Sequence, residues 1–314
     1  MALDPEHLAY PKRRYGMDHD LYPWRNLFAE GPPTFADGTR LAVLITVPLE
    51  FFPLDPRGIP FRAPGSMVTP YPDFRHYTTR DYGNRVGIYR LLKVLEASSM
   101  KANVAINAAV AKRYPVLLRD ILAAGHEPVA HGVDMDALHY GGMEEETEHR
   151  QIRESIDTLQ EASGQPIAGW LSPAYSSSFL TPELLAAHGF RYTCDWSNDD
   201  MPYTIQTRQG DLTAVPISQE LSDRRIIIDC HQSEDSMERQ VRDQFEVLYS
   251  ETSNQGARML SLTLTPYISG LPFRIRTVAS ILASLLGEPG VRAMTGTELV
   301  EAYRPGRLEV HSSV

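Results

Sequence analysis

From residue 42 to residue 303 the sequence alternates between strand-like and helix-like segments, and this alternation limits the possible folds more than any other feature. The run at 42–47, AVLITV, is continuously apolar between turn-forming residues, which is typical of a strand buried on both faces. Apolar residues then recur at helical spacing over 88–95, and a second strand-like run follows at 102–106. Strands that alternate with helices predict a parallel sheet.

The same pattern continues to the C-terminal region. About seven such units favour an irregular, distorted β/α barrel of about seven parallel strands over an open sheet. We expect three parts: an irregular N-terminal arm at 1–40, the barrel at 41–304, and a C-terminal tail at 305–314. Further strands are expected at 128–130, 167–171, 191–194, 214–217, 225–229, 259–264 and 291–294, and further helices at 110–122, 143–163, 181–189, 236–251, 272–286 and 296–303.

Charge and cysteine content narrow the class of protein. Thirty basic against forty acidic residues give a net charge of −10, which argues against nucleic acid or an anionic membrane as the main partner. The two cysteines cannot build a disulfide framework or a cysteine zinc cluster, so a reducing compartment is expected. The first twenty residues contain no apolar core typical of a signal peptide, and the most apolar stretch, 41–54, is too short to span a bilayer. We therefore expect a cytoplasmic protein.

Polar residues recur where the predicted strands end, and in a β/α barrel the active site lies at the C-terminal ends of the strands. Carboxylates and imidazoles just beyond buried strands are partly desolvated, which shifts their pKa values and suits acid–base chemistry. A structural role is the alternative, in which His131 caps a backbone carbonyl and residues 195–200 only form a turn. The catalytic candidates are Glu50, His131, Asp195, Asn198, Asp199 and His231, and the candidates for substrate contact are Tyr82, Trp170, Ser172, Trp196, Thr265 and Tyr267.

Five segments in order resemble motifs of the polysaccharide deacetylase family, carbohydrate esterase family 4. Within that family the sequence most resembles the subgroup of metal-independent allantoinases and cyclic-imide hydrolases. The resemblance covers roughly residues 40–303 and implies the distorted barrel of that family. The segments are RDYGNRVG at 80–87, GHEPVAHG at 125–132, GWLSP at 169–173, the stretch 195–203, and TPYISG at 265–270 with Pro272 and Arg274 following.

The departures from the family pattern concern its chemistry. The family's first motif carries two aspartates, one as general base and one as metal ligand, whereas this sequence has Pro48 at one position and Glu50 near the other. The second histidine of the family's His-x-x-x-His pair is Met135 here. Leu171 stands in place of an arginine that orients an aspartate, and Thr265 stands in place of a catalytic histidine. The resemblance therefore implies an incomplete catalytic set.

The same departures affect metal binding. A catalytic zinc needs three protein ligands, of which Glu50 and His131 supply two. Asp134, Asp136 or His139 would have to supply the third, and none has the family spacing. We expect no cofactor, while zinc or another divalent metal remains an open alternative.

Three functions stay open. The first is a hydrolase that cleaves a non-peptide carbon–nitrogen bond in a small cyclic amide or imide or an N-acyl compound, with Glu50 or His131 as base and Asp195, Asn198 or a backbone N–H stabilising the oxyanion. The second is an inactive binding protein or a supporting subunit of an active paralogue. The third is a metal-dependent deacetylase that uses Glu50, His131 and Asp134 or Asp136. The expected partner is a small-molecule substrate, and a homo-oligomer or a hetero-oligomer with such a paralogue is possible.

Overall fold

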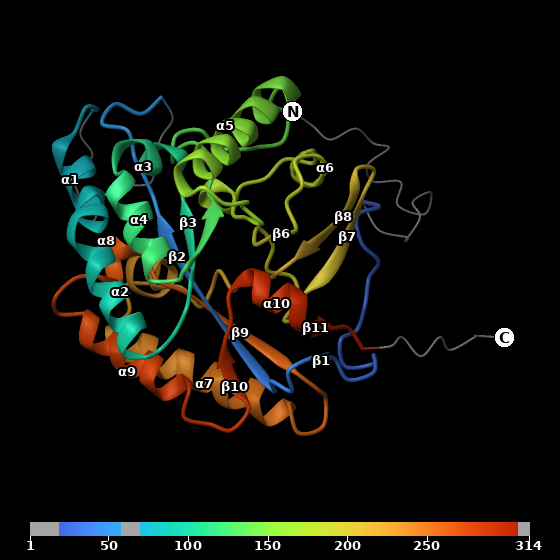
Figure 1. Cartoon of the computed structure of the whole chain (residues 1–314). Helices are drawn as coiled ribbons and strands as arrows, with labels where there is room; N and C mark the ends of the chain where they lie inside the picture. Colours follow the sequence, from blue (N-terminus) through green and yellow to red (C-terminus); the bar gives the residue numbers. More distant parts are fainter. Residues whose placement is uncertain (1–18, 58–69, 307–314) are drawn as a thin grey trace.

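The computed structural model describes residues 19–57 and 70–306, and its centre is a curled nine-stranded sheet (Figure 1). β2 (Leu41–Leu49) runs through the sheet with every residue buried, as its unbroken apolar sequence predicts. β9 (Arg258–Thr263) pairs with one side of β2, while β10 (Val291–Ala293) and β3 (Asn103–Ile106) pair with the other side. All of these pairs are parallel, so the residues that follow β2, β3 and β9 emerge at the same edge of the sheet.

Beyond β3 the sheet continues through five further strands. Eight of the nine strands run parallel, and the last strand forms an antiparallel hairpin with its neighbour. The distorted barrel is therefore confirmed, with one parallel strand more than expected. The hairpin is the main element that the sequence pattern did not predict, since it placed a strand only at 214–217. In spatial order these strands are β4 (Glu127–Ala130), β5 (Gly169–Trp170), β6 (Tyr192–Thr193), β8 (Gly210–Ala214) and β7 (Tyr203–Thr207).

The sheet stays open within the described residues, because neither β9 nor β10 pairs with β7 at the other end of the strand order. The segment that could have closed it was predicted as a strand at 225–229, and this prediction is wrong: Arg224–Asp229 forms one short π-helix, η5. Its three consecutive isoleucines favour a strand locally. The side chains of Asp223 and Arg224 override that preference, because both are fixed by polar partners on other elements at the mouth of the sheet.

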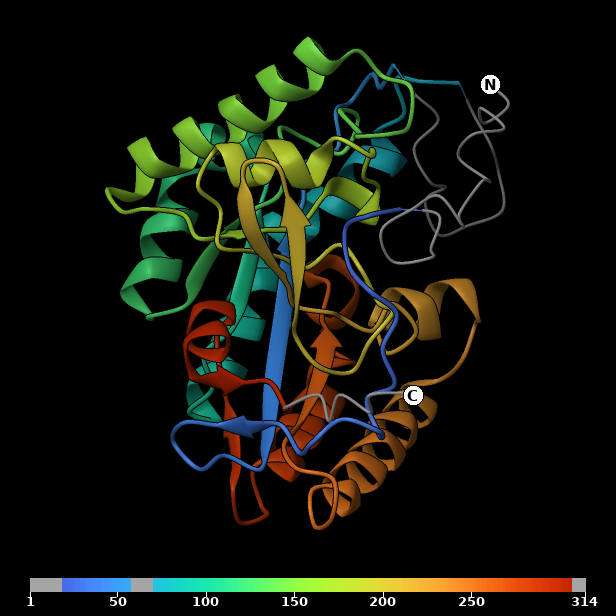
Figure 2. The ribbon, with the colours of Figure 1, turned by 90° about the vertical axis from the view of Figure 1, so that its right-hand side faces the viewer.

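Helices cover the outer face of the curled sheet, and the long α5 and α7 lie at opposite ends of it, where α5 packs against β4 and α7 against β9 (Figures 1 and 2). The predicted helices are confirmed with ends that differ by a few residues, except for the helix expected at 110–122. This range forms two helices, which are separated at the non-helical Tyr114 because Pro115 begins the second one. The ten α-helices of the described residues are α1 (Phe74–Tyr82), α2 (Ile88–Ala97), α3 (Ala108–Arg113), α4 (Pro115–Ala123), α5 (Glu145–Ser163), α6 (Thr181–Ala187), α7 (Glu234–Glu251), α8 (Pro266–Ser269), α9 (Ile275–Leu285) and α10 (Gly296–Ala302).

Residues 53–84 contain many Pro, Gly, Tyr and Asp residues, a composition that predicts one long loop, but the structure is only partly a loop there. Residues 58–69 lie outside the described residues, but α1 and the π-helix Gly83–Gly87 (η3) occupy the end of the segment. α1 shows little apolar periodicity, which is why it was not predicted. The available signal was Asp73, whose carboxylate accepts a hydrogen bond from the Arg75 N–H and caps the helix.

The described part of the N-terminal arm runs along the surface and is joined to the end of the chain. β1 (Thr34–Phe35) pairs antiparallel with β11 (Tyr303–Arg304), so the arm and the residues after α10 lie side by side (Figure 2). Residues 1–18 and 307–314 lie outside the described residues, and the proposed division into arm, barrel and tail stays a prediction. Among the described helices, none is both long and apolar enough to cross a membrane.

Candidate active site

His131 follows β4 and presents one ring nitrogen to a cavity at the mouth of the sheet. Its Nδ1 lies 2.6 Å from the backbone carbonyl oxygen of Leu171. A carbonyl oxygen can only accept, so Nδ1 carries a proton and, in the neutral ring, Nε2 carries the lone pair. Nε2 is buried and has no hydrogen-bond partner in the described residues. The imidazole is therefore fixed in the tautomer that a general base requires.

Asn107, which directly follows β3, links the backbone at Phe51 to the backbone at His131. Its amide nitrogen donates to the carbonyl oxygen of His131, and its amide oxygen accepts from the Phe51 N–H at 2.8 Å. One side chain thus ties the chain after β2 to the chain after β4. This link sets the separation between Glu50 and His131.

Glu50 follows β2 and is held by an arginine from the π-helix. Nη2 of Arg224 donates to both carboxylate oxygens, at 3.0 and 2.7 Å, and also to the hydroxyl of Tyr267 at 2.7 Å. The other neighbour of the carboxylate is His131, whose Nε2 lies 3.9 Å from Oε1. Glu50 and His131 are both buried, and the predicted pair is thus brought together, with Arg224 as a third member.

The charges of this cluster determine its protonation. Burial raises the pKa of Glu50, but the charge of its neighbours, Arg224 first among them, outweighs burial, so the pKa lies below its ordinary value. Burial lowers the pKa of Arg224, but Glu50 and its other neighbours raise it above the ordinary value. At neutral pH the cluster therefore contains an ionised carboxylate and a guanidinium cation.

The cavity at this cluster measures about 30 Å³, close to the volume of one water molecule. Tyr175 forms part of its wall, and burial raises the pKa of that phenol to about 12, so the hydroxyl keeps its proton at neutral pH. Ala174 and Tyr175 both adopt left-handed backbone conformations, with φ of 55° and 57°, which is a strained geometry for residues other than glycine. The cavity is also lined by Pro48, Glu50, His131, Arg224 and Thr265.

Asp195, Ser172 and Trp170 support the site from behind instead of lining it. The Asp195 carboxylate accepts hydrogen bonds from the Ser172 N–H at 2.5 Å and the Ser172 hydroxyl at 2.8 Å. The indole N–H of Trp170 donates to the same hydroxyl at 2.8 Å. These bonds fix the turn that carries the Leu171 carbonyl. Burial raises the pKa of Asp195, the hydrogen bonds with Ser172 oppose this, and the pKa remains above its ordinary value.

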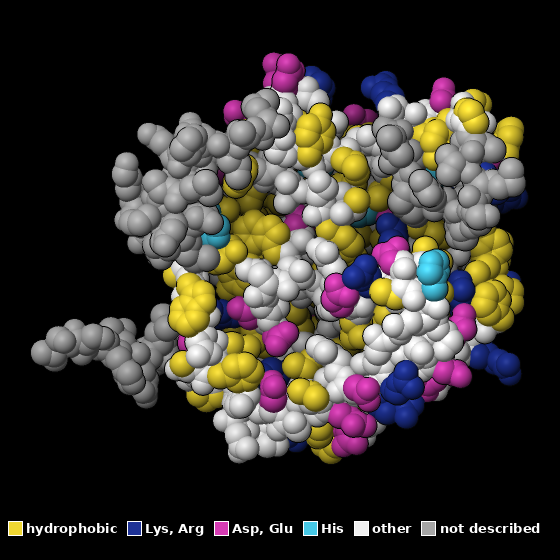
Figure 3. Space-filling view, turned by 180° about the vertical axis from the view of Figure 1, so that it is seen from behind, with side chains coloured by type: hydrophobic (Ala, Val, Ile, Leu, Met, Phe, Trp, Pro, Cys, Tyr) yellow, Lys and Arg dark blue, Asp and Glu magenta, His cyan; other side chains and the backbone are white. Residues whose placement is uncertain are grey.

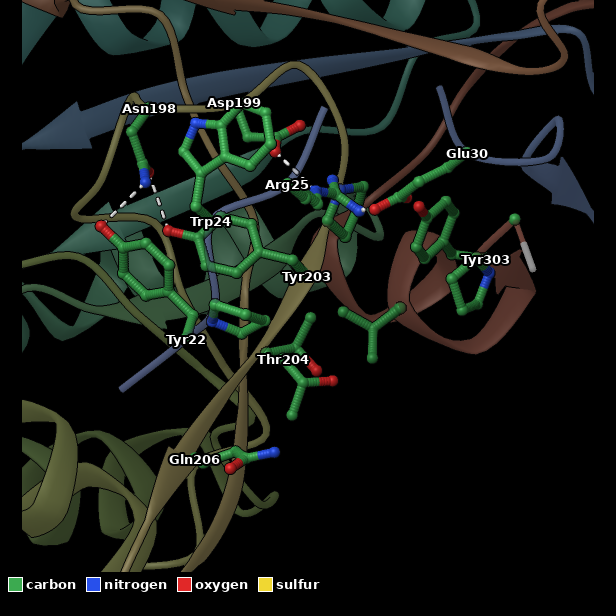
Figure 4. Close-up of a pocket in the computed structure, with 16 residues that line it drawn as sticks. Tyr22, Trp24, Arg25, Glu30, Asn198, Asp199, Tyr203, Thr204, Gln206 and Tyr303 are labelled. Carbon is green, nitrogen blue, oxygen red and sulfur yellow. Dashed lines mark hydrogen bonds and ion pairs between the residues drawn. The ribbon is translucent and has the colours of Figure 1, made fainter. Parts of the chain in front are cut away.

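Asn198, Asp199 and Trp196 are wrongly placed by the sequence prediction. Asn198 and Asp199 line a separate groove between the arm and the β7–β8 hairpin (Figure 4). Trp196 stacks on Tyr203 beside that groove, with ring centroids 6.5 Å apart. The loop after β6 leaves the mouth of the sheet beyond Asp195, whose carboxylate is bonded to Ser172, and so brings Asn198 and Asp199 into the groove.

Two further candidates also lie away from the cavity. His231 is exposed on the turn that follows the π-helix, because the strand expected before it does not form. Tyr82 ends α1 and accepts a hydrogen bond from Arg90. Thr265 and Tyr267 lie where expected: Thr265 lines the cavity and Tyr267 contacts Arg224.

The candidate metal ligands do not converge. The Asp134 carboxylate accepts from the backbone N–H groups of Asp136 and Ala137, and the Asp136 carboxylate accepts from the Arg57 N–H. His139 is buried against Glu148, with Nδ1 3.3 Å from its carboxylate. In residues 19–57 and 70–306 no three His, Cys, Asp or Glu side chains are grouped to hold a metal ion. With the Glu50 carboxylate already bound by Arg224, this donor set does not fit a catalytic zinc.

Sequence reasoning missed Arg224, Tyr175 and Asp223. Arg224 and Asp223 lie in the segment predicted to run into a strand, where a side chain would not reach Glu50. The available signal was the charged trio 223–225 directly before an apolar run, which is unusual at the start of a buried strand. Asp223 accepts hydrogen bonds from the Thr265 N–H and the Ser269 hydroxyl, both at 2.6 Å, and burial raises its pKa to about 6.

Comparison with known proteins identifies relatives of this chain. Residues 70–193 match the sequence profile of the polysaccharide deacetylase family. A peptidoglycan deacetylase of Helicobacter pylori is 23% identical over 254 residues, which cover 71% of this chain and 85% of that protein. A Schizosaccharomyces pombe protein provisionally assigned as a polysaccharide deacetylase is 26% identical over 245 residues, covering 71% and 74%. The solved structure of PuuE allantoinase superposes with a TM-score of 0.78 at 23% identity, covering 90% of this chain and 97% of that one.

These findings support the polysaccharide deacetylase family for this chain, as the five sequence segments predict. The structural likeness to the allantoinase supports the same fold. The narrower resemblance to allantoinases and cyclic-imide hydrolases stays a prediction.

Proposed function

We propose that this protein hydrolyses a non-peptide carbon–nitrogen bond in a small cyclic amide or imide, or an N-acyl compound, without a tightly bound zinc ion. The observation that carries the proposal is the buried Nε2 of His131, which has a fixed tautomer and lies 3.9 Å from the Glu50 carboxylate. The family relatives named as deacetylases and the likeness to an allantoinase are in keeping with this class of reaction.

In the proposed reaction His131 acts first as base and then as acid. Nε2 takes a proton from the attacking water, whose oxygen forms a bond with the substrate carbonyl carbon. The Glu50 carboxylate stabilises the imidazolium that results. Arg224 and the protonated hydroxyl of Tyr175 face the cavity and stabilise the developing oxyanion. The carbon–nitrogen bond then breaks, and the proton on His131 moves to the leaving nitrogen.

Substrate entry requires the cavity to enlarge, because about 30 Å³ admits little more than water. We expect the side chain of Tyr175 to move and open the cavity. Its left-handed backbone is strained, so leaving this conformation costs little free energy. Cyclic imides suit the proposal because their carbonyl groups need less activation than an ordinary amide.

The test is turnover of hydantoin, dihydrouracil, succinimide and N-acetylglucosamine, with products measured by mass spectrometry. His131→Ala and Glu50→Gln are each expected to lower kcat/KM for the preferred substrate by at least about 10²-fold. His231→Asn is the matched control, since His231 is exposed and asparagine tolerates its positive φ of 53°. Undiminished turnover in His131→Ala or in Glu50→Gln would rule out the proposed mechanism.

A binding protein without catalytic activity is the second candidate. It is favoured by the ion pair with Arg224, which makes Glu50 a weak base. A thermal-shift screen with the same compounds separates the two candidates. Stabilisation of the protein by a compound that is never converted supports the binding protein, and product formation excludes it.

A further inference from the structure

Two histidines are stacked where α5 and α6 pack against each other (Figure 1). Figure 3 shows only small, separate histidine patches on the face behind that of Figure 1. In contrast, the ring centroids of His149 on α5 and His188 directly after α6 lie 4.8 Å apart, with 37° between the ring planes. Both side chains are half-buried. Because histidine changes its charge near neutral pH, such a stack makes the contact between two helices sensitive to pH.

The hydrogen bonding of His188 opposes its protonation. Nε2 of this ring is buried and has no hydrogen-bond partner among the described residues. In the neutral ring this nitrogen can remain unprotonated, so that no buried donor is left without an acceptor. The imidazolium carries a proton on both nitrogens, and its buried Nε2–H group would have no acceptor in the described part of the chain, which costs free energy.

The charges around His188 act in the same direction. Burial lowers the pKa of His188, and the His149 imidazole and the Arg153 guanidinium lower it further, while Asp157 opposes them. The pKa remains below its ordinary value. Arg153 and Asp157 are exposed and pair with each other at 3.9 Å between Nε and Oδ2, so their opposite effects on His188 largely cancel. Burial and the His149 ring therefore determine the direction.

The start of α6 is held by groups that keep their charge in mild acid. The Glu148 carboxylate on α5 accepts hydrogen bonds from the hydroxyl groups of Ser178, at 2.6 Å, and Thr181, at 2.5 Å. Burial raises the pKa of Glu148, but the groups bonded to the carboxylate lower it by more, so Glu148 stays ionised at pH 5. Glu183 of α6 pairs with Arg208 between β7 and β8, at 3.4 Å between Oε1 and Nε. A fall in pH from 7 to 5 therefore acts on the C-terminal end of α6 and leaves its start bound.

We propose that the stacked histidines form a pH-sensitive contact, and that the C-terminal end of α6 separates from α5 more often when His188 takes up a proton. In the chain, α6 lies between the turn that carries Ser172 and the strand β6, which leads to Asp195. Ser172 and Asp195 support the Leu171 carbonyl that fixes the His131 ring, so a looser α6 affects both sides of this support. The effect on His131 rests on the proposed function, whereas the opening of α6 does not depend on it.

The first measurement is the titration of His188 by NMR in the full chain labelled with ¹³C-histidine, with His188→Gln used to assign its signal. His188 is expected to titrate below the ordinary pKa of about 6.5. His149→Gln is expected to raise the pKa of His188, because it removes the neighbouring imidazole. Arg150→Gln is the matched control and should leave this pKa nearly unchanged, since it removes an exposed cation next to His149 whose guanidinium bonds to the Thr147 hydroxyl.

The second measurement is amide hydrogen exchange of α6 at pH 7 and pH 5, expressed as protection factors so that the intrinsic effect of pH on exchange is removed. With its lowered pKa, His188 binds a proton less tightly in the closed contact than in the open one, so a fall in pH favours opening. Protection at the C-terminal end of α6 is expected to fall at least about threefold in the unchanged chain and to stay constant in His188→Gln.

The two measurements together decide on the proposal. A His188 pKa below about 6.5 that His149→Gln raises, with a loss of protection that His188→Gln removes, supports it. A His188 pKa at or above about 6.5, or one that His149→Gln leaves unchanged, overturns it. Protection that is the same at both pH values, or that falls equally in His188→Gln, also overturns it. No turnover is measured, so failure of this contact and failure of the hydrolase are seen in separate experiments.

Discussion

Removing the guanidinium of Arg224 is the sharpest test of how Glu50 is held. Arg224→Met leaves the Glu50 carboxylate, whose side chain is 4% exposed, buried without its ion-pair partner. Breaking one side of a buried pair typically costs about 3–5 kcal/mol. The Arg224 side chain is 21% exposed, so we expect the lower end, about 3 kcal/mol. This is a large share of the roughly 5–15 kcal/mol by which a protein is stable.

The assay is urea unfolding at pH 7 of four proteins: the unchanged chain, Arg224→Met, Glu50→Gln and the double variant. The double variant should recover most of the loss, because no buried charge is left unpaired. At pH 4 the deficit of Arg224→Met should shrink, since Glu50 has a lowered pKa only while Arg224 is present and takes up a proton readily without it. Arg225→Met is the control, because the pair of Arg225 with Glu220 is exposed and should contribute little.

Two results would refute this reasoning. One is a loss at pH 7 for Arg224→Met no larger than that for Arg225→Met. The other is a double variant whose loss equals the sum of the two single losses, which would mean that Glu50 and Arg224 do not interact.

Two further predictions concern elements around the site. The pKa of Asp223 is raised from 3.8 to about 6, so the native state binds this proton more tightly than the unfolded state does. The proton therefore stabilises the native state at low pH by about 3 kcal/mol. This stabilisation is lost as the pH rises from 4 through 6. Asp223→Asn should therefore gain stability relative to the unchanged chain between pH 4 and pH 7 in urea titrations, and a pH-independent difference would contradict the assignment. Gly87→Ala should destabilise by about 1–3 kcal/mol, because its Cβ would lie 2.0 Å from the Pro266 carbonyl oxygen. Gly141→Ala is the control, because a Cβ at Gly141 would have no atom within 4 Å, and this variant should unfold at a nearly unchanged urea concentration. Equal losses of stability in Gly87→Ala and Gly141→Ala would show that η3 and α8 are not closely packed.

The sequence predicts much of the fold because its buried strands are long or strongly apolar. The runs that became β2, β3 and β9 have no competing interpretation, and the turns after them place Glu50, His131 and Thr265 at one edge of the sheet. The hairpin of β7 and β8 was largely missed because its residues alternate between core and solvent and include many polar side chains.

The site was predictable only in part, because its remaining members depend on tertiary contacts. The isoleucine run after Arg224 has the local preference of a strand, and only the partners of Asp223 and Arg224 at the mouth of the sheet hold it as a π-helix. Asn198 and Asp199 follow a strand as His131 does, yet their loop leaves the mouth and binds Tyr22 and Arg25 of the arm. In both segments, contacts between residues far apart in the sequence determine the structure, and no local sequence pattern predicts such contacts.

The central claim is that Glu50, Arg224 and His131 support hydrolysis without a bound cation. The most direct measurement is turnover of the substrate panel by protein dialysed against a strong chelator, with the metal content determined in the same sample. We expect metal-depleted protein to keep its rate, added zinc not to raise it, and His131→Ala to lower it by at least about 10²-fold. A rate that disappears on chelation and returns with one equivalent of zinc would contradict the account.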